Sequence, residues 1–271
     1  MLKAWQTNWR SYLIEGWALG MFMVSAVLVV ILMDHPALPV RGLITDGWIR
    51  RMIIGIAMGL TAVLLIYSGW GKRSGAHMNP AVTLAFLQIE RISPYDALGY
   101  ILGQCIGSAG SMLLMKTLLF SYISAPEVNY VVTVPGSTGV WTALGLEAAM
   151  AAGMFLMVLI MSNHKRLAPY TGYAAGVLVA VYITVEAPLT GMSINPARTI
   201  ASALSSGIWT DWWIYCIGPV TGMQAAAFIY RHWYRYTHGG NCLTMDCHMS
   251  GEKHHNETYT VLGPTQRLTP S

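Results

Sequence analysis

The stretches SGAHMNPAVTLAF, residues 74–86, and TGMSINPARTIASAL, residues 190–204, share the tripeptide Asn-Pro-Ala at the head of a short apolar run. Asn is a favoured N-cap residue, and Pro suits the first helical position because its missing N–H costs nothing there. The small Ala lets two such helix starts approach closely. The sequence therefore predicts two helix starts, one at Asn79, Pro80 and Ala81 and the other at Asn195, Pro196 and Ala197.

The chain around these stretches has the composition of a polytopic membrane protein. Of its 271 residues, 54% are hydrophobic and 10% are charged, whereas a typical soluble domain is about 25% charged. About 20 apolar residues cross the hydrocarbon core as a helix. On that scale the sequence predicts six spans, at about 11–33, 49–70, 95–118, 140–162, 168–187 and 211–234. The runs at about 79–89 and 195–205 are each about half a span.

The two halves of the chain repeat each other. Glu15 lies in the first span within LIEGWALGMFMV, and Glu147 lies in the fourth within GLEAAMAAGMFLMV. Each half then reads as two spans, a half-span with Asn-Pro-Ala and a third span. Because three is an odd number, the halves must cross the membrane in opposite directions. This predicts an inverted repeat with its site near the midplane.

The two half-spans are expected to enter from opposite faces as re-entrant loops, because unpaired backbone cannot face lipid. Their helix N-termini then meet at the midplane, and each carries about half a positive charge that repels cations. An Asn that caps its helix uses its side-chain oxygen on the backbone, so its NH₂ stays free to bind a passing water or hydroxyl. The arrangement favours a pore that passes neutral molecules and hinders proton hopping.

These residues resemble the signature boxes of the aquaporin, or major intrinsic protein, family. The similarity covers about residues 8–235 and includes Ser74–Thr83, Gly191–Arg198, the Glu15/Glu147 pair and the motif GQCIG around Gln104. It implies an all-α polytopic membrane protein with six transmembrane helices and two re-entrant half-helices, and a homotetramer with one pore per subunit. The channel domain would be residues 1–235, with a first repeat at about 8–120 and a second at about 135–235.

Arg198 is costly inside a membrane, which marks it as a functional residue. The alternative is an Arg that snorkels to the interface. The resemblance places it in the family's aromatic/arginine filter, with Met58, Ile183 and Met192 at the other three positions. This filter would be apolar on three sides. It lacks the aromatic and the His of typical water channels, and also the Trp, Gly and Phe of typical glycerol channels.

Further residues are expected to support the half-helices. Glu15 and Glu147 would accept hydrogen bonds from buried N–H groups of the re-entrant loops, rather than carry protons. Gln104 is assigned to the same support by the resemblance. His77 is expected to pack the loop and hydrogen-bond its backbone, and gating by protonation of His77 is the alternative.

Lys and Arg residues predict the orientation. With the N-terminus in the cytoplasm, eleven fall inside and five outside, which favours cytoplasmic N- and C-termini in a plasma or inner membrane. The tail at 236–271 is polar, lacks periodicity and is predicted to be mostly disordered. It gathers soft ligands that suit zinc or copper, although a solvated tail with incidental ligands is the alternative: His238, Cys242, Cys247, His248, His254 and His255.

The function predicted first is a passive channel for water, with ammonia, hydrogen peroxide and urea as further solutes. Thr199, Ala203 and Tyr215 match the family's water type, whereas Cys216 stands where water channels usually have an aromatic. A glycerol or polyol facilitator is the alternative, and a coupled secondary transporter is a weaker one. An enzyme, a cofactor and a nucleic-acid partner are not expected, since no catalytic set of residues and no basic run occurs.

Overall fold

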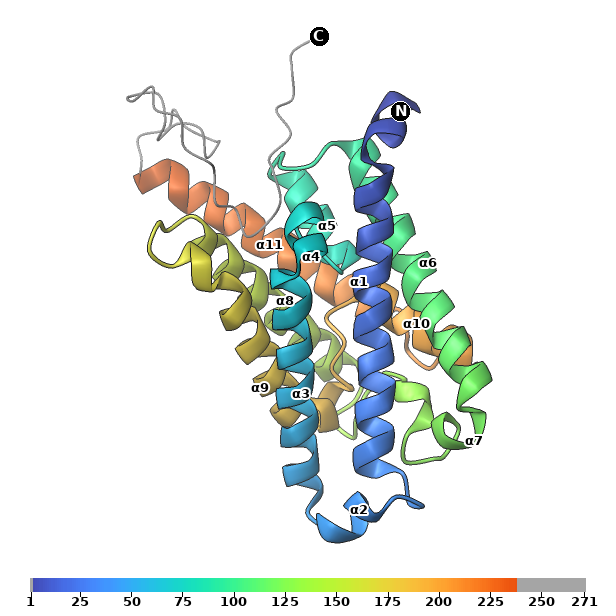
Figure 1. The fold of residues 1–271 in the computed structure, drawn as a ribbon. Helices are drawn as coiled ribbons and strands as arrows, with labels where there is room; N and C mark the ends of the chain where they lie inside the picture. The colour runs from blue at the N-terminus through green and yellow to red at the C-terminus, as the bar shows by residue number, and fades with distance from the viewer. Residues whose placement is uncertain (1, 238–271) are drawn as a thin grey trace.

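The computed structural model describes residues 2–237, and side-chain burial for residues 4–233. Eleven α-helices and two short 3₁₀ helices make up this part of the chain (Figure 1). The helices are α1 (Leu2–Asp34), α2 (Pro39–Leu43), α3 (Gly47–Tyr67), α4 (Gly69–Ser74), α5 (Pro80–Gln88), α6 (Pro94–Leu118), α7 (Phe120–Ile123), η1 (Asn129–Val131), α8 (Val140–Ser162), η2 (Ala168–Tyr170), α9 (Thr171–Thr190), α10 (Pro196–Ser206) and α11 (Ile214–Thr237).

Six of these helices have the length of a membrane span. Five are also apolar enough to cross a membrane: Ala4–Asp34, Gly47–Tyr67, Pro94–Leu118, Val140–Ser162 and Ala168–Thr190. The sixth, α11, has 24 residues and carries Arg231 and Arg235 near its end. Its hydropathy is lower than that of the other five helices. The six long helices lie at the six predicted spans, and α11 is the most polar of them at its C-terminal end.

The long helices pair in the same way in both halves of the chain. In the first half α1 packs closely on α6, and in the second α8 packs on α11. Gly107 of α6 lies against the backbone of Gly16, and Gly222 of α11 lies against the backbone of Ala148. A Cβ at either glycine would overlap the carbonyl oxygen of the facing residue. Glycine therefore lets each pair of helices approach at backbone distance.

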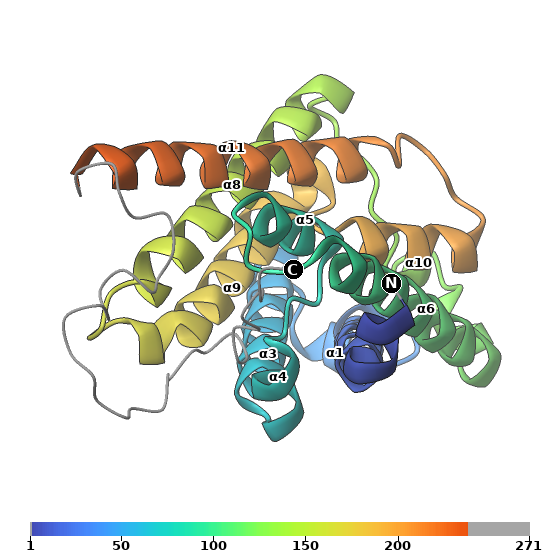
Figure 2. The same ribbon diagram turned by 90° about the horizontal axis from the view of Figure 1, so that it is seen from above.

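The two short helices α5 and α10 lie inside this bundle. In the view from above they lie between α6 and α11 (Figure 2). α10 packs mainly on α6, and α5 packs mainly on α11, so each half-helix packs mainly on a long helix from the other half of the chain. Their bounds, Pro80–Gln88 and Pro196–Ser206, agree with the predicted runs to within a residue or two.

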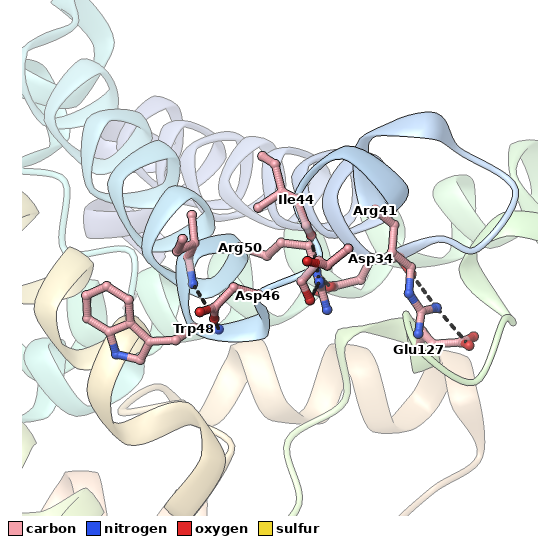
Figure 3. A network of polar contacts seen from close by, with 9 residues as sticks. Asp34, Arg41, Ile44, Asp46, Trp48, Arg50 and Glu127 are labelled. Carbon is pink, nitrogen blue, oxygen red and sulfur yellow. Dashed lines mark hydrogen bonds and ion pairs between the residues drawn. The ribbon is translucent and has the colours of Figure 1, made fainter.

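Charged residues in and next to the segment that connects α1 to α3 form a network of hydrogen bonds and ion pairs (Figure 3). Arg50 bonds Asp34 with its Nε at 2.7 Å and uses Nη1 on the carbonyl oxygens of Ile44 and Thr45. The Asp46 side chain caps α3 by accepting from two backbone N–H groups. Arg41 forms an ion pair of 2.8 Å with Glu127, which follows α7. The network joins this connection to the segment after α7 at one end of the bundle.

Candidate pore

The two Asn-Pro-Ala boxes are helix starts. Asn79 Oδ1 accepts from the N–H of Ala81 at 2.9 Å, and Asn195 Oδ1 accepts from the N–H groups of Ala197 at 3.1 Å and Arg198 at 3.3 Å. Pro80 and Pro196 occupy the first helical position. Both helices therefore begin with their backbone donors partly satisfied by the Asn side chain.

Each Asn also reaches across to the other half of the chain. Asn79 Nδ2 donates to the carbonyl oxygen of Ile194, and Asn195 Nδ2 donates to the carbonyl oxygen of Met78, both at 2.7 Å. The expectation that the whole NH₂ group stays free is therefore wrong. One N–H of each Asn side chain donates to a carbonyl oxygen of the other loop. The second N–H of each side-chain amide is left to face the cavity.

The residues before each box adopt an unusual backbone. Ala76 and Met78 have φ of 48°, and Met192 and Ile194 have φ of 45° and 46°. This left-handed region is uncommon for residues other than glycine, and it is costly. The same alternation before both boxes shows that the two loops share one fold. Gly75 and Gly191 precede them at φ of 93° and 80°, where glycine is the natural choice.

Glu15 holds the first loop. Its carboxylate accepts from the N–H of His77 at 3.0 Å, the N–H of Met78 at 2.7 Å and the hydroxyl of Ser74 at 2.8 Å. The side chain is fully buried. The hydrogen bonds that this carboxylate accepts offset the free-energy cost of burying its charge in the helix bundle.

Glu147 holds the second loop in the same way. It accepts from the N–H of Ser193 at 2.9 Å, the N–H of Ile194 at 2.6 Å and the hydroxyl of Thr190 at 3.0 Å. It is also fully buried. The hydroxyls of Ser74 and Thr190 therefore have the same role, since each donates to the buried Glu of its own half. The sequence similarity of the two boxes did not predict this role.

A tyrosine completes each of these clusters. The hydroxyl of Tyr100 donates to the carbonyl oxygen of Ser74, and the hydroxyl of Tyr215 donates to that of Thr190. Both tyrosines are buried. Sequence reasoning noted Tyr215 only as a family-type position and missed Tyr100. The alignment of IYCIG around Tyr215 with GQCIG around Gln104 pairs Tyr215 with Gln104, so the repeat gives no signal for Tyr100.

Outside these clusters the two halves differ. In the first, Gln104 Nε2 bonds Glu15 at 2.8 Å and Thr83 Oγ1 at 3.2 Å. His77 Nδ1 lies 3.1 Å from the same hydroxyl, and its ring stacks on Phe86. The prediction that the His77 side chain bonds backbone is therefore corrected to a bond with a threonine hydroxyl. The loop N–H groups of His77 and Met78 donate to Glu15, and the His77 ring contacts the hydroxyl of Thr83, six residues along the chain.

The second half uses hydroxyl groups where the first uses His and Gln. Ser193 Oγ lies 2.6 Å from Thr199 Oγ1, and Thr133 Oγ1 lies 2.8 Å from the same atom. Thr133 comes from the segment before α8, so that segment contacts the half-helix directly. All three side chains are buried.

A cavity of about 530 Å³ runs along both boxes. The four predicted filter residues Met58, Ile183, Met192 and Arg198 all line it, as do the two Asn residues. Met58 and Met192 are 2% and 7% exposed, so the wall they form is closely packed. Nη1 of Arg198 is buried without a hydrogen-bond partner. No carboxylate lies among the lining residues in the described part of the chain.

Arg51 also lines this cavity, although from the sequence it was counted only among the five Lys and Arg residues outside the membrane. It lies seven positions before Met58 on α3, and Ile54 lies between them. Spacings of three, four and seven place residues on one helix face, and this periodicity could have identified Arg51. The predicted metal ligands of the tail, His238, Cys242, Cys247, His248, His254 and His255, lie outside the described residues. Within residues 2–237 no group of three or more candidate metal ligands occurs.

The chain is similar to known proteins over most of its length. A family model described as "Major intrinsic protein" matches residues 2–230. "Aquaporin NIP1-3" of Oryza sativa subsp. japonica is 34% identical over 188 residues, which are 69% of this chain and 64% of that protein. "Glycerol uptake facilitator protein-like 6" of Lactiplantibacillus plantarum is 37% identical over 66% of this chain and 84% of its own. The chain thus matches less than two thirds of the length of the rice relative.

The fold is also found among solved structures. The X-ray structure of the aquaglyceroporin from Plasmodium falciparum superposes with a TM-score of 0.68 and 17% sequence identity, over 82% of this chain and 94% of that one. The helix pairs and the two half-helices therefore define an all-α membrane fold of the aquaporin type. The chain belongs to the major intrinsic protein family.

Proposed function

We propose that this protein is a passive transmembrane channel for water and other small neutral solutes such as ammonia, hydrogen peroxide and urea. The observation that carries the proposal is the pair of helix N-termini at Asn79 and Asn195, which face one cavity of about 530 Å³. Each N-terminus presents positive partial charge and one remaining amide N–H. A neutral molecule with an oxygen acceptor is bound in passing, whereas a cation is repelled.

The filter lies where Met58, Ile183, Met192 and Arg198 line the same cavity. The three apolar side chains narrow the path without offering hydrogen bonds. Arg198 supplies donors on one side and a positive charge that opposes cations. In this proposal Glu15, Glu147, Gln104 and His77 position the two loops, and the Asn-Pro-Ala residues form the second barrier to protons.

A glycerol or polyol facilitator is the second candidate. A relative at 37% identity is called "Glycerol uptake facilitator protein-like 6". The three apolar filter side chains would contact the carbon atoms of a polyol, while Arg198 would donate to its hydroxyl oxygens. Proton-coupled transport is supported less well, because the lining residues of the described part include no carboxylate that could carry a proton.

The assembly and orientation follow the family pattern. We place the N- and C-termini in the cytoplasm of a plasma or inner membrane, since the Lys and Arg residues lie mostly on that side. A homotetramer would cover the apolar outer faces of α3 and α9, where Leu60, Leu64, Val177, Val181 and Val185 are exposed.

Stopped-flow light scattering of proteoliposomes tests the function. The solutes are water, glycerol, urea, ammonia and hydrogen peroxide. We expect fast, non-saturating water flux with an activation energy close to that of diffusion. Ile183→Trp should block it, because Ile183 lines the cavity. The control is Leu114→Trp on the exposed face of α6, outside both the cavity lining and the proposed subunit interface, which should conduct normally. Saturable uptake that depends on an ion gradient would refute the channel.

A further inference from the structure

Five methionine side chains line the cavity, and each comes from a different segment of the chain. They are Met58 of α3, Met78 before α5, Met154 of α8, Met192 before α10 and Met223 of α11. Among the described residues no cysteine lines this cavity. A thioether is oxidised far more readily than a guanidinium, an amide or a hydrocarbon. The methionines are therefore the side chains of this wall that an oxidant attacks first.

These methionines differ in how much of their surface is exposed. Met223 has no exposed surface and Met58 is 2% exposed, whereas Met192 is 7% exposed and Met78 is only half-buried. Met192 is also one of the four filter residues, so a solute that passes the filter meets the wall that it forms. Met78 and Met192 therefore combine exposed surface with a place on the solute path.

Both of these methionines lie next to positive partial charge. Met78 immediately precedes Asn79, the N-cap of α5, and Met192 lies three residues before Asn195, the N-cap of α10. A helix N-terminus stabilises negative charge that develops during a reaction. Met154 is also 7% exposed, but it lies within the long helix α8, away from either helix start in the sequence.

The reaction of a thioether with hydrogen peroxide needs no further reactant. The sulfur lone pair attacks one peroxide oxygen, the O–O bond breaks and an S–O bond forms. The departing oxygen carries the developing negative charge, takes the proton of the attacked oxygen and leaves as water. Sulfur loses two electrons and the peroxide gains them, so the products are one sulfoxide and one water.

We propose that hydrogen peroxide entering the cavity oxidises Met78 and Met192 to methionine sulfoxide, and that the oxidised pore conducts less. This inference rests on the proposed function, in which hydrogen peroxide is one of the solutes. Confinement favours the reaction, because a solute in the filter is held against the wall instead of diffusing away from it. Hydrogen peroxide is then both a solute of the pore and a reagent that limits its own passage.

Oxidation changes the wall of the filter in size and in polarity. A sulfoxide carries an oxygen that a thioether lacks, so an oxidised Met192 is larger and strongly polar. Because Met192 shares the filter with Met58 and Ile183, the added oxygen takes space from the path and accepts hydrogen bonds from passing water. An enzyme that reduces sulfoxides has to reach the side chain, which a path inside a helix bundle prevents. The loss of conduction therefore accumulates with the peroxide dose.

The modified sites are mapped on the full chain in proteoliposomes. Hydrogen peroxide is added until about half of the free methionine in the same sample is oxidised, catalase then removes the peroxide, and peptides are analysed by mass spectrometry. We expect sulfoxide at Met78 and Met192 in at least about half of the chains. Met223, which is buried, and Met21, which is 43% exposed on the outer surface of α1, should show at most about a tenth of that amount.

Oxidation of Met78 and Met192 that is no faster than that of Met21 would overturn the two sites. A peroxide-sensitive dye inside the vesicles distinguishes the two reasons for this outcome. Normal peroxide entry would refute the inference and leave the channel standing. Absent peroxide entry would refute hydrogen peroxide as a solute as well.

Water flux tests the effect of the oxidation. Each variant is compared with its own untreated sample, so differences in basal flux cancel. Flux of oxidised wild type should fall by at least about half, and that of Met21→Leu should fall as much. Met78→Leu combined with Met192→Leu has no thioether at either position and should keep at least about nine tenths of its untreated flux.

Two outcomes of the flux measurement would contradict the proposal. A loss in the double variant equal to that of wild type would show that the damage lies at other residues. Undiminished flux in wild type that carries both sulfoxides would show that the oxidised pore still conducts freely.

Discussion

Glu15 and Glu147 make the same contacts in opposite halves of the molecule. Each accepts hydrogen bonds from two consecutive backbone N–H groups of a re-entrant loop and from the hydroxyl that begins that loop. The loops have few other partners for these donors, because their left-handed residues prevent regular backbone pairing. The two carboxylates therefore hold the two helix starts in place from opposite sides.

Replacing either carboxylate by an amide should destabilise the fold. In Glu147→Gln the new NH₂ faces an N–H donor of the loop, which leaves a buried donor unpaired at a cost of about 1 to 3 kcal/mol. We expect lower thermal stability in detergent and lower water flux, with a similar loss for Glu15→Gln. Glu90→Gln, whose exposed side chain makes only a 3.5 Å ion pair with Arg231, is the control and should keep the stability of wild type. Normal stability of both buried variants would contradict the support role.

The Asn side chains are predicted to exclude cations as well as to cap helices. Asn195→Asp keeps the oxygen that caps α10 but loses the donor to Met78 and adds a negative charge. The barrier to cations should fall, and proteoliposomes should show a proton leak with a pH-sensitive dye while water flux continues. Asn163→Asp, on the loop after α8, serves as the control. No leak in Asn195→Asp would place the proton barrier at the filter alone.

The filter residues should decide which solute passes. Met58→Phe combined with Ile183→His introduces an aromatic ring and a donor into the cavity wall. We expect water flux to be retained and glycerol and urea flux to fall at least about tenfold, because the path becomes narrower and more polar. Leu118→His, at the exposed end of α6, is the control. Unchanged selectivity in the double variant would show that the assignment of Met58 and Ile183 is wrong.

The glycine contact between α1 and α6 should tolerate no side chain. In Gly107→Ala the methyl group meets the backbone of Gly16, which cannot move aside as a side chain could. We expect a loss of about 1 to 3 kcal/mol in stability, as for overpacked cores. Gly110→Ala lies three positions further on the same helix with no atom nearby. It should be neutral or slightly stabilising because alanine favours helix, and thermal melts of the two variants compare them directly.

The contact between Arg41 and Glu127 should depend on pH. The hydrogen bond from Arg41 lowers the pKa of Glu127 below its ordinary value of 4.5. Because the folded pKa is the lower one, the contact contributes at pH above the ordinary value and is lost as pH falls through the folded pKa. Hydrogen exchange of residues 35–46, corrected for the intrinsic rate, should speed up as pH drops from about 6 to about 3. Glu127→Gln should exchange fast at both pH values.

Local chemistry made much of the fold predictable. The Asn-Pro pairs specify helix starts by capping and by the fixed φ of proline, and the apolar lengths located the long helices. The buried Glu pair was recognised because a carboxylate in an apolar segment needs donors. The same lengths located α11, a helix of 24 residues whose last turns are polar.

Contacts between distant residues were beyond prediction from local patterns. The bond from Asn79 to Ile194 joins positions 115 residues apart, and nothing near Asn79 indicates its partner. Tyr100 and Tyr215 are ordinary apolar-segment residues until their hydroxyls meet the loops. Arg51 was counted only among the outside cations, because charge alone did not show that it lies on the Met58 face of α3. The sequence around His77 is compatible with several hydrogen-bond partners, and the choice of Thr83 depends on the tertiary packing.

The crossed bonds of Asn79 and Asn195 also constrain how a cell can make this protein. When the ribosome has delivered the first half-helix to the translocon, the carbonyl oxygen of Ile194 that Asn79 will bond has not yet been synthesised. The carbonyl oxygen of Met78 likewise has no donor until Asn195 has been synthesised. The first re-entrant loop therefore cannot reach its final geometry until translation has passed the second box. A nascent chain truncated between the boxes would therefore lack the acceptor of the Asn79 amide and carry an unfinished loop.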